Sequence, residues 1–230
     1  MKPPPLYFVL PFILQSTVWR ILMRPFFIFF THFEVHGLEN LKDLPGPLIF
    51  APNHSSEIDS VLLPLALPFW SRFGPMFYVL KEFSYFNDLS FGWRRFLYKG
   101  WLFKSLGAYP IRPGKKDYAV SLARHMQILN AGGSVCIFPE GGVTKTGEIS
   151  SAHGGVGYLA YTTGVPVVPV LIKGTYGLSI DRILGRAQKI EFHFLSPIQK
   201  TELFAGLDTT DVVSMKVAGN RILDRLKQAS

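Results

Sequence analysis

A histidine and an aspartate five positions apart are the residues of this chain whose types are best suited to chemistry. They are His54 and Asp59, in the stretch Asn-His-Ser-Ser-Glu-Ile-Asp. On one continuous helix a five-residue step rotates by about 140°, so the two side chains would point apart. If His54 lies in a loop and Asp59 in the first turn of the next helix, the carboxylate can accept a hydrogen bond from the imidazole. The pair would then be an oriented general base, suited to deprotonating a hydroxyl that attacks an acyl carbonyl.

The pair alone leaves other interpretations open. Asp59 stands three residues after Ser56, the spacing of a capping box, so it could serve only to cap a helix. With Glu57 the pair could bind a metal ion, but no second cluster completes such a site, and we predict neither a metal nor a cofactor. A serine nucleophile is not indicated, because the chain has no Gly-x-Ser-x-Gly motif.

A second group of residues follows an apolar run that is typical of a buried strand. The stretch Phe-Pro-Glu-Gly-Gly-Val-Thr-Lys places Glu140, Gly141, Gly142 and Lys145 in one turn. Glycines allow backbone N–H groups to approach an anion, and the carboxylate could hold an acceptor hydroxyl or brace a cation. An ordinary turn between a strand and a loop could have the same residues.

Two further features accompany these groups. Arg112 comes directly after a short expected strand and is a reasonable phosphate clamp, although a surface arginine would look the same. The run Val165–Val170 is apolar, contains two prolines, and is expected to be a core strand that shapes the site. Cys136, the single cysteine, lies in another apolar run, which predicts a buried residue and excludes an intrachain disulfide.

The elements that must position these residues alternate between strand and helix patterns. This alternation predicts one α/β domain over residues 33–230, with a mostly parallel mixed sheet flanked by helices. His54 would lie at the carboxyl end of a strand, where sites form in open sheets. The expected strands cover 33–36, 47–52, 109–111, 135–138, 165–172 and 190–195, and the expected helices cover 56–67, 117–129, 151–163 and 209–228, the last capped by Thr209 or Thr210.

Residues 1–32 differ from the rest of the chain. Two apolar runs, 6–14 and 25–30, are separated by Trp19, Arg20 and Arg24. Each run is shorter than the roughly 20 residues that span a bilayer, and no signal-peptide cleavage site follows. We therefore predict a monotopic membrane anchor, a helical hairpin with its arginines at the headgroups and its tryptophan at the interface. The alternatives are a buried core hairpin and a true membrane span.

The composition favours an acidic partner. The chain has 230 residues, a formal net charge of +8, 48% hydrophobic residues and twenty phenylalanines. A basic protein suits nucleic acid, an anionic membrane surface or an acidic carrier. Nucleic acid is not expected, because basic runs do not exceed two residues and no RNA-binding or zinc-finger motif occurs. The expected location is therefore a membrane surface, on its cytoplasmic face.

In this order, the four motifs resemble those of the glycerolipid acyltransferase family, which includes 1-acylglycerol-3-phosphate acyltransferases. Asn53, His54 and Asp59 match its Asn-His-x-x-x-x-Asp motif. The strand ending at Arg112, the Phe-Pro-Glu-Gly motif and the valine-proline strand match its other three. Lys81 also falls where members often carry a lysine. The resemblance covers roughly residues 33 to 195.

The resemblance implies fatty acyl transfer from acyl-CoA or acyl-carrier protein to a lysophospholipid hydroxyl, in phospholipid biosynthesis. His54 would be the base, Asp59 would orient it, and Arg112 with the Glu140 loop would bind the acceptor. Members that form phosphatidic acid usually have arginine where this chain has Val143. The acceptor could therefore instead be glycerol 3-phosphate, another lysophospholipid, an amino-lipid or a glycolipid. A non-catalytic membrane lipid-binding protein is the alternative from another class.

Overall fold

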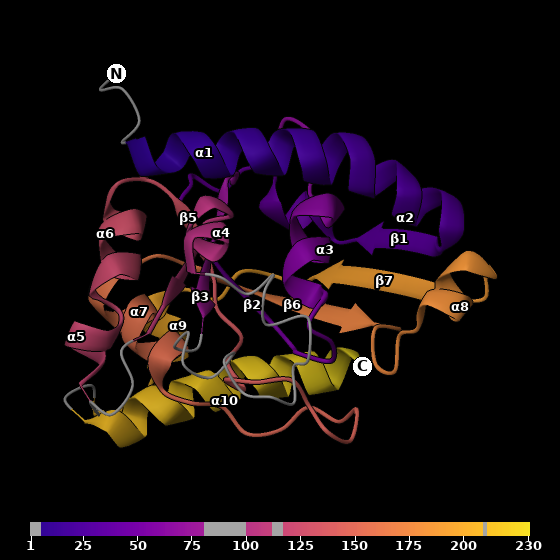
Figure 1. Ribbon diagram of the computed structural model, residues 1–230. Coiled ribbons are helices and arrows are strands. Elements are labelled where there is room, and N and C mark those ends of the chain that lie inside the picture. The colour runs from indigo at the N-terminus through magenta and orange to yellow at the C-terminus, as the bar shows by residue number, and fades with distance from the viewer. Residues whose placement is uncertain (1–5, 81–99, 112–116, 209–210) are drawn as a thin grey trace.

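Seven strands form one mixed sheet between two layers of helices (Figure 1). The computed structural model describes residues 6–80, 100–111, 117–208 and 211–230. The strand order is β1-β7-β6-β2-β5-β3-β4, and the described pairs are all parallel except β6–β7. The predicted α/β fold is confirmed. The strands are β1 (His32–His36), β2 (Ile49–Pro52), β3 (Met76–Leu80), β4 (Ala108–Pro110), β5 (Ser134–Cys136), β6 (Val167–Lys173) and β7 (Lys189–Phe194).

The helices cover the two faces of the sheet (Figure 1). One face carries α1 (Leu6–Leu14), η1 (Gln15–Met23), α2 (Arg24–Phe30), α3 (Asp59–Ala66) and α4 (Gly100–Ser105). The other face carries α5 (Tyr118–Ser121), α6 (Ala123–Asn130), α7 (Gly155–Thr163), α9 (Lys200–Leu203) and α10 (Val212–Ala229). In sequence, a short 3₁₀ helix, η2 (Leu38–Leu41), follows β1, and α8 (Ile180–Leu184) is part of the connection from β6 to β7.

Several elements differ from the sequence prediction. β3 was not expected, because its apolar residues lie in a segment dominated by aromatic and basic residues. The helix predicted over 117–129 is divided into α5 and α6. The proposed caps of the last helix lie outside the described residues, and α10 is instead capped by Asp211, whose carboxylate accepts a hydrogen bond from the Ser214 N–H at 2.6 Å.

The N-terminal segment forms one helix, so the predicted hairpin is wrong. η1 is a π-helical stretch between α1 and α2, and Leu14 and Met23 at its junctions have right-handed helical φ and ψ. Pro11 lies inside α1, where its missing N–H does not end the helix. The segment Tyr7–Phe30, 24 residues, is long and apolar enough to cross a membrane by length and composition.

Packing against the domain explains why this helix is continuous. Trp19 and Phe27 are buried in the same core as β6, β7 and α3. The buried Gln15 amide donates to the carbonyls of Met76 (2.7 Å) and Leu106 (3.0 Å) and accepts from the Met76 N–H (2.8 Å). Arg20 is also buried, so it and Trp19 do not occupy the headgroup positions predicted for them.

Candidate active site

The candidate site begins where β2 ends, because Asn53 fixes the chain there. The Asn53 amide donates to the Ile172 carbonyl at 3.0 Å and accepts from the Ile172 N–H at 2.7 Å. These two bonds imitate one more residue pair of the β2–β6 ladder, immediately after Pro52, which has no N–H to donate. The side chain of Asn53 is 4% exposed, so the clasp is shielded from water. It sets the position from which His54 leaves the sheet.

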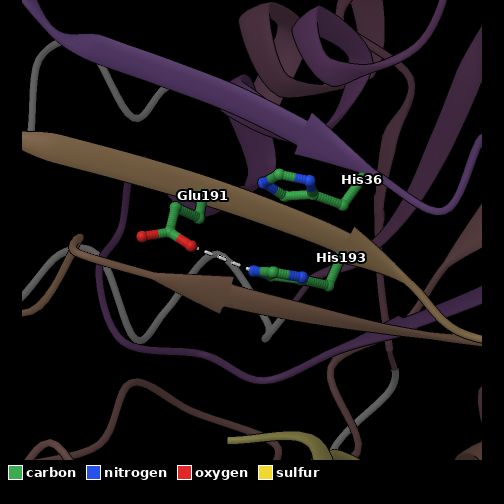
Figure 2. A group of neighbouring side chains, drawn as sticks. All are labelled: His36, Glu191 and His193. Atoms are coloured by element: carbon green, nitrogen blue, oxygen red, sulfur yellow. Dashed lines mark hydrogen bonds and ion pairs between the residues drawn. The ribbon is translucent and has the colours of Figure 1, made fainter.

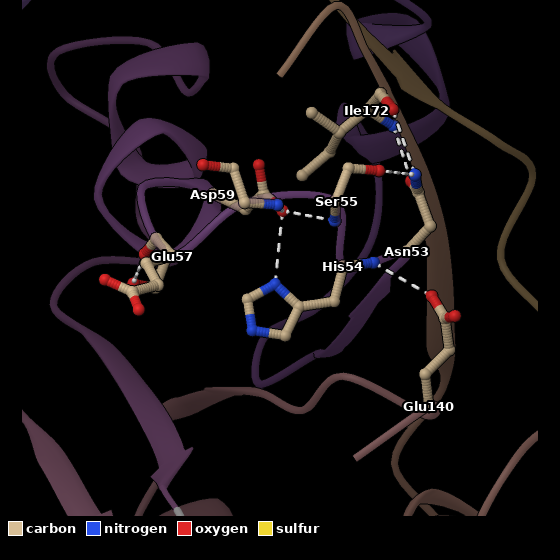
Figure 3. A network of polar contacts seen from close by, with 9 residues as sticks. Asn53, His54, Ser55, Glu57, Asp59, Glu140 and Ile172 are labelled. Atoms are coloured by element: carbon tan, nitrogen blue, oxygen red, sulfur yellow. Dashed lines mark hydrogen bonds and ion pairs between the residues drawn. The ribbon is translucent and has the colours of Figure 1, made fainter. Parts of the chain in front are cut away.

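His54 and Asp59 are brought together as predicted (Figure 3). Their contact joins Nδ1 of the imidazole to Oδ2 of the carboxylate at 3.1 Å. His54 lies in the loop after β2, and Asp59 is the first residue of α3. A carboxylate can only accept, so Nδ1 carries the proton and Nε2 keeps its lone pair. This is the orientation required for Nε2 to act as a base.

The Asp59 carboxylate is held by the loop that it organises. Its Oδ2 also accepts from the backbone N–H groups of Ser55 at 2.7 Å and Ser56 at 2.8 Å. The expectation that Ser56 caps the helix is wrong, since Ile58 precedes α3 and Asp59 collects the N–H groups before it. The residue is 0% exposed. Three hydrogen bonds to one oxygen therefore fix the orientation of this carboxylate toward His54.

Phe138 and Thr144 hold the other side of the histidine. The Phe138 ring stacks on the His54 imidazole, with ring centroids 3.8 Å apart and planes 18° apart. The Thr144 N–H donates to the His54 carbonyl at 2.8 Å. These contacts and Asp59 leave the His54 side chain only 15% exposed. The imidazole is therefore fixed in position before a substrate binds.

Glu140 braces two loops. Its Oε1 accepts from the His54 N–H at 2.9 Å (Figure 3). Its Oε2 accepts from both the N–H and the hydroxyl of Ser150 at 2.9 Å each. The residue is 7% exposed. Both oxygens face protein donors, which makes Glu140 a positioning residue; contact with an acceptor stays a prediction.

The rest of the Glu140 loop is more exposed. Gly141 has φ +69°, and a Cβ there would come within 2.6 Å of the His153 ring, so only glycine fits. Gly142 is half-buried and Lys145 is exposed. The structure brings this loop beside His54 through Glu140 and Thr144. The remaining predicted substrate-binding residues, Lys81 and Arg112, lie outside the described residues.

Cys136 is not suited to be a nucleophile. It is buried as predicted, at 0% exposed, in β5 next to β2. Burial raises the pKa of its thiol well above the ordinary value, and the negative charge of Asp59 raises it further. The thiolate, which is the reactive form, is therefore disfavoured. Cys136 therefore does not supply a nucleophile for His54 to activate.

Sequence reasoning missed the roles of Asn53, Phe138 and Glu140 in the support of His54. Asn53 and Phe138 belong to motifs, but a motif does not reveal which surface each side chain contacts. Glu140 was expected to face a ligand, because its contact with the distant His54 cannot be read from the sequence. The sequence signal that could have indicated Asn53 and Glu140 is that each is a polar residue close after an apolar strand.

Known proteins with similar sequences and folds are acyltransferases by name. The chain is 31% identical over 146 residues to a chloroplastic 1-acyl-sn-glycerol-3-phosphate acyltransferase of Brassica napus, covering 62% of this chain and 37% of that protein. It is 26% identical over 188 residues to a probable 1-acyl-sn-glycerol-3-phosphate acyltransferase of Mycoplasma pneumoniae, covering 76% and 65%. The chain thus spans less than two thirds of the length of either relative.

A solved structure has the same fold. The 1-acyl-sn-glycerophosphate acyltransferase PlsC from Thermotoga maritima superposes with a TM-score of 0.58 at 19% sequence identity, over 96% of this chain and 93% of that one. The family model described as Acyltransferase matches residues 32–173, more than half of the chain, and that range includes His54, Asp59 and Glu140. The chain therefore belongs to the Acyltransferase family.

Proposed function

We propose that this protein transfers a fatty acyl group from acyl-CoA or acyl-carrier protein to the hydroxyl of a lysophospholipid, foremost 1-acylglycerol-3-phosphate. The observation that carries the proposal is the 3.1 Å contact between His54 Nδ1 and the buried Asp59 carboxylate. It leaves Nε2 as a base. The names of the relatives support acyl transfer to 1-acylglycerol-3-phosphate. The reaction would be a step of phospholipid biosynthesis.

In the proposed reaction, Nε2 of His54 takes the proton of the acceptor hydroxyl as its oxygen attacks the thioester carbonyl. The new C–O bond forms as the C–S bond breaks. The departing thiolate then takes the proton from the imidazolium, which returns His54 to its neutral form. Asp59 stabilises the imidazolium in between. Proton and acyl group are both accounted for without a protein nucleophile.

His54→Ala tests the mechanism. Purified protein would be supplied with acyl-CoA or acyl-carrier protein and a panel of lysolipids, and product would be counted by mass spectrometry. We expect the variant to lose at least about 10³-fold in rate, the range for removal of a catalytic base. His32→Ala, which removes an exposed histidine on β1, is the control and should keep full activity. Near-wild-type transfer by His54→Ala would refute the mechanism.

A different acceptor is the second candidate, and Val143 favours it. This side chain is 40% exposed on the loop between Glu140 and Thr144, so it offers no charge to a phosphate. Lys145 can supply a point charge but not a bidentate fork. Val143→Arg should raise kcat/KM for 1-acylglycerol-3-phosphate relative to uncharged acceptors. If the wild type forms phosphatidic acid alone on expression, the second candidate fails.

We further propose that residues 1–32 associate with a membrane through the outer side of the N-terminal helix, on its cytoplasmic face, where the acyl donors occur. The side chains turned away from the domain are large and apolar, and they are Val9, Leu10, Phe12, Ile13, Val18, Ile21, Leu22, Ile28 and Phe29. An exposed apolar surface of this kind marks an interaction site. We call these nine residues the outer face.

Two exposed tryptophans flank the outer face. Trp70 is 89% exposed and follows Phe69, whose carbonyl accepts a hydrogen bond from Arg20 of the N-terminal helix. Trp101 is exposed on α4, which contacts α1. Tryptophan prefers the interface between water and lipid. The two indoles therefore support a helix that lies on the bilayer.

The membrane proposal needs point substitutions, because deleting the helix would remove Trp19 and Phe27 from the core. Ile21→Asn/Leu22→Asn should reduce sedimentation with vesicles of phosphatidylglycerol and phosphatidylcholine at least fivefold. The matched control is Val212→Asn/Val213→Asn, two exposed apolar residues at the start of α10 on the other face of the sheet. Equal loss in both variants, or none in the first, would contradict the proposal.

A further inference from the structure

A cluster of histidine and acidic side chains lies on the edge of the sheet. It consists of His36 from β1 and of Glu191 and His193 from β7 (Figure 2). One ligand atom from each of the three lies within 4.8 Å of the other two. None of these residues belongs to the candidate active site. Among the described residues this is the grouping of three or more His, Cys, Asp or Glu side chains close enough to share one metal ion.

Strand register explains why these residues meet. β1 and β7 pair in parallel, with His36 opposite His193 and Glu34 opposite Glu191. In a sheet, residues directly opposite each other point to the same face, and their strands are about 4.8 Å apart. The two imidazole rings accordingly stack with centroids 4.6 Å apart and planes 20° apart. The backbone thus presents two imidazoles side by side in a fixed position.

The acidic side chains complete the cluster one row earlier. Glu191 Oε2 lies 3.2 Å from His193 Nε2, and Glu34 Oε2 lies 3.3 Å from His36 Nε2. Ligands around tetrahedral zinc are about 3.3 Å apart, given metal–ligand bonds of about 2.0–2.1 Å. The Glu191–His193 separation already fits this value. The ligand atom of His36 lies within 4.8 Å of the other two.

We propose that His36, Glu191 and His193 form a binding site for a divalent transition metal, with Zn²⁺ the best match. Imidazole and carboxylate ligands suit zinc, copper and nickel rather than magnesium or calcium. Three protein ligands leave a fourth position for water. The bound metal would link β1, the edge strand that follows the N-terminal helix, to β7.

Lys189 shares the carboxylates but leaves the metal position available. Its ammonium lies 2.9 Å from Glu191 Oε1 and 3.1 Å from Glu34 Oε2. Glu191 therefore presents Oε1 to the lysine and Oε2 to the histidine side.

The site is separate from the catalytic pair. The alternate residues of β7, Ile190, Phe192 and Phe194, face the core that contains α3. Glu191 and His193 consequently point to the opposite face of the sheet from the helix that carries Asp59. The metal proposal therefore stands whether or not His54 catalyses acyl transfer.

Calorimetric titration of untagged, chelator-treated full-length protein with Zn²⁺ tests the site. We expect one zinc per chain with affinity in the micromolar range, and at least a tenfold weaker affinity in His36→Ala, His193→Ala and Glu191→Gln. His32→Ala is the matched control, because it removes an exposed histidine from the same face of β1 two rows away. That variant should bind zinc as the wild type does.

A second readout is the melting temperature with zinc and with chelator. Zinc should raise it in the wild type and in His32→Ala, because a ligand bound only to the folded state stabilises it, and the rise should vanish in His36→Ala/His193→Ala. Equal melting temperatures of all variants in chelator would show that folding is intact. The proposal would be overturned if zinc still bound to the double variant, or if His32→Ala weakened zinc binding as much as the substitutions at His36 and His193. The cluster would then be a set of ordinary ion pairs on the surface.

Discussion

Two of the histidine–carboxylate pairs among the described residues have nearly equal lengths but very different surroundings. His54 Nδ1 lies 3.1 Å from Asp59, and His193 Nε2 lies 3.2 Å from Glu191. The Asp59 side chain is 0% exposed and accepts from two backbone N–H groups. The Glu191 side chain is 22% exposed and shares its charge with Lys189.

The difference shows that distance alone does not determine which chemistry a histidine–carboxylate pair can support. Asp59 contacts Nδ1 and leaves Nε2 for a substrate, whereas Glu191 occupies Nε2 itself. The i, i+5 loop spacing holds the first pair in one geometry, while the i, i+2 strand spacing leaves the second pair on the surface. The first arrangement suits proton transfer and the second suits a metal ligand set.

The largest expected effect comes from neutralising the buried carboxylate. Asp59→Asn keeps the shape but cannot stabilise an imidazolium, so kcat should fall about 10³-fold. Glu191→Gln makes the same chemical change in the exposed pair and should leave kcat within about twofold of the wild type. Steady-state acyl transfer measures both. Equal losses in the two variants would end the distinction between the pairs.

A third histidine shows what burial does without a carboxylate partner. His125 is 0% exposed and its Nε2 donates to the Tyr78 carbonyl at 3.1 Å. Burial lowers its pKa to about 4. In the unfolded chain the histidine pKa is about 6.5, so as the pH falls the unfolded chain binds a proton before the folded protein does. The free energy of unfolding should therefore fall by about 3 kcal/mol between about pH 6.5 and about pH 4.

Urea unfolding between pH 4 and 7 measures this effect. His125→Gln keeps a hydrogen-bond donor but removes the titrating group, so its free energy of unfolding should depend less on pH in that window. At pH 7 His125 is neutral in the folded protein, so this loss in the free energy of unfolding is absent. An unchanged pH slope in the variant would mean that other groups cause the acid sensitivity.

Glu140→Gln should have an intermediate effect, because it weakens the support of His54 and not the pair itself. The new amide nitrogen is a donor, so it cannot accept the hydrogen bonds that the Glu140 carboxylate receives. This loss should lower the free energy of unfolding by about 2 kcal/mol and kcat by about tenfold. Ser150→Ala removes one of the three hydrogen bonds to the carboxylate and should cost about 1 kcal/mol. Thermal unfolding and transfer assays separate the two. If Glu140→Gln lowered the free energy of unfolding and kcat less than Ser150→Ala does, the bracing role of Glu140 would be contradicted.

The smallest effect is expected at Glu34, which contacts Lys189 and His36 in the exposed cluster. Exposed ion pairs contribute little, so Glu34→Gln should move the melting temperature in chelator by no more than about 1 °C. Differential scanning calorimetry would detect a larger shift, which would mean that the surface pair is as structural as the buried one.

The sequence predicted the parts of the fold that depend on local patterns. The strand before His54, the loop and the helix that carries Asp59 follow from apolar periodicity and from the five-residue spacing, although the helix begins three residues later than the expected 56–67. The buried strand at Cys136 and the helix that ends at Gly164 follow from the same kind of pattern, and Gly164 has the left-handed φ of +69° expected of a helix end.

The missed features depend on tertiary contacts. Arg20 is buried within the π-helical stretch η1, and the sequence carries no signal for that stretch. The hairpin was expected because Arg20 and Arg24 separate two apolar runs, but contacts of Gln15 and Phe27 with the domain hold the segment as one helix. The pairing of His36 with His193 joins strands at opposite ends of the chain, and the sequence specifies their register only through the folded sheet.

The burial of Trp19 and Phe27 has a practical consequence for work with this protein. The N-terminal helix contributes both side chains to the core beneath it, while its outer face remains apolar. A shortened version that begins at β1 would uncover that core and would be prone to aggregate. The whole chain, including the N-terminal helix, is therefore the appropriate sample for crystallography, titration and assay alike.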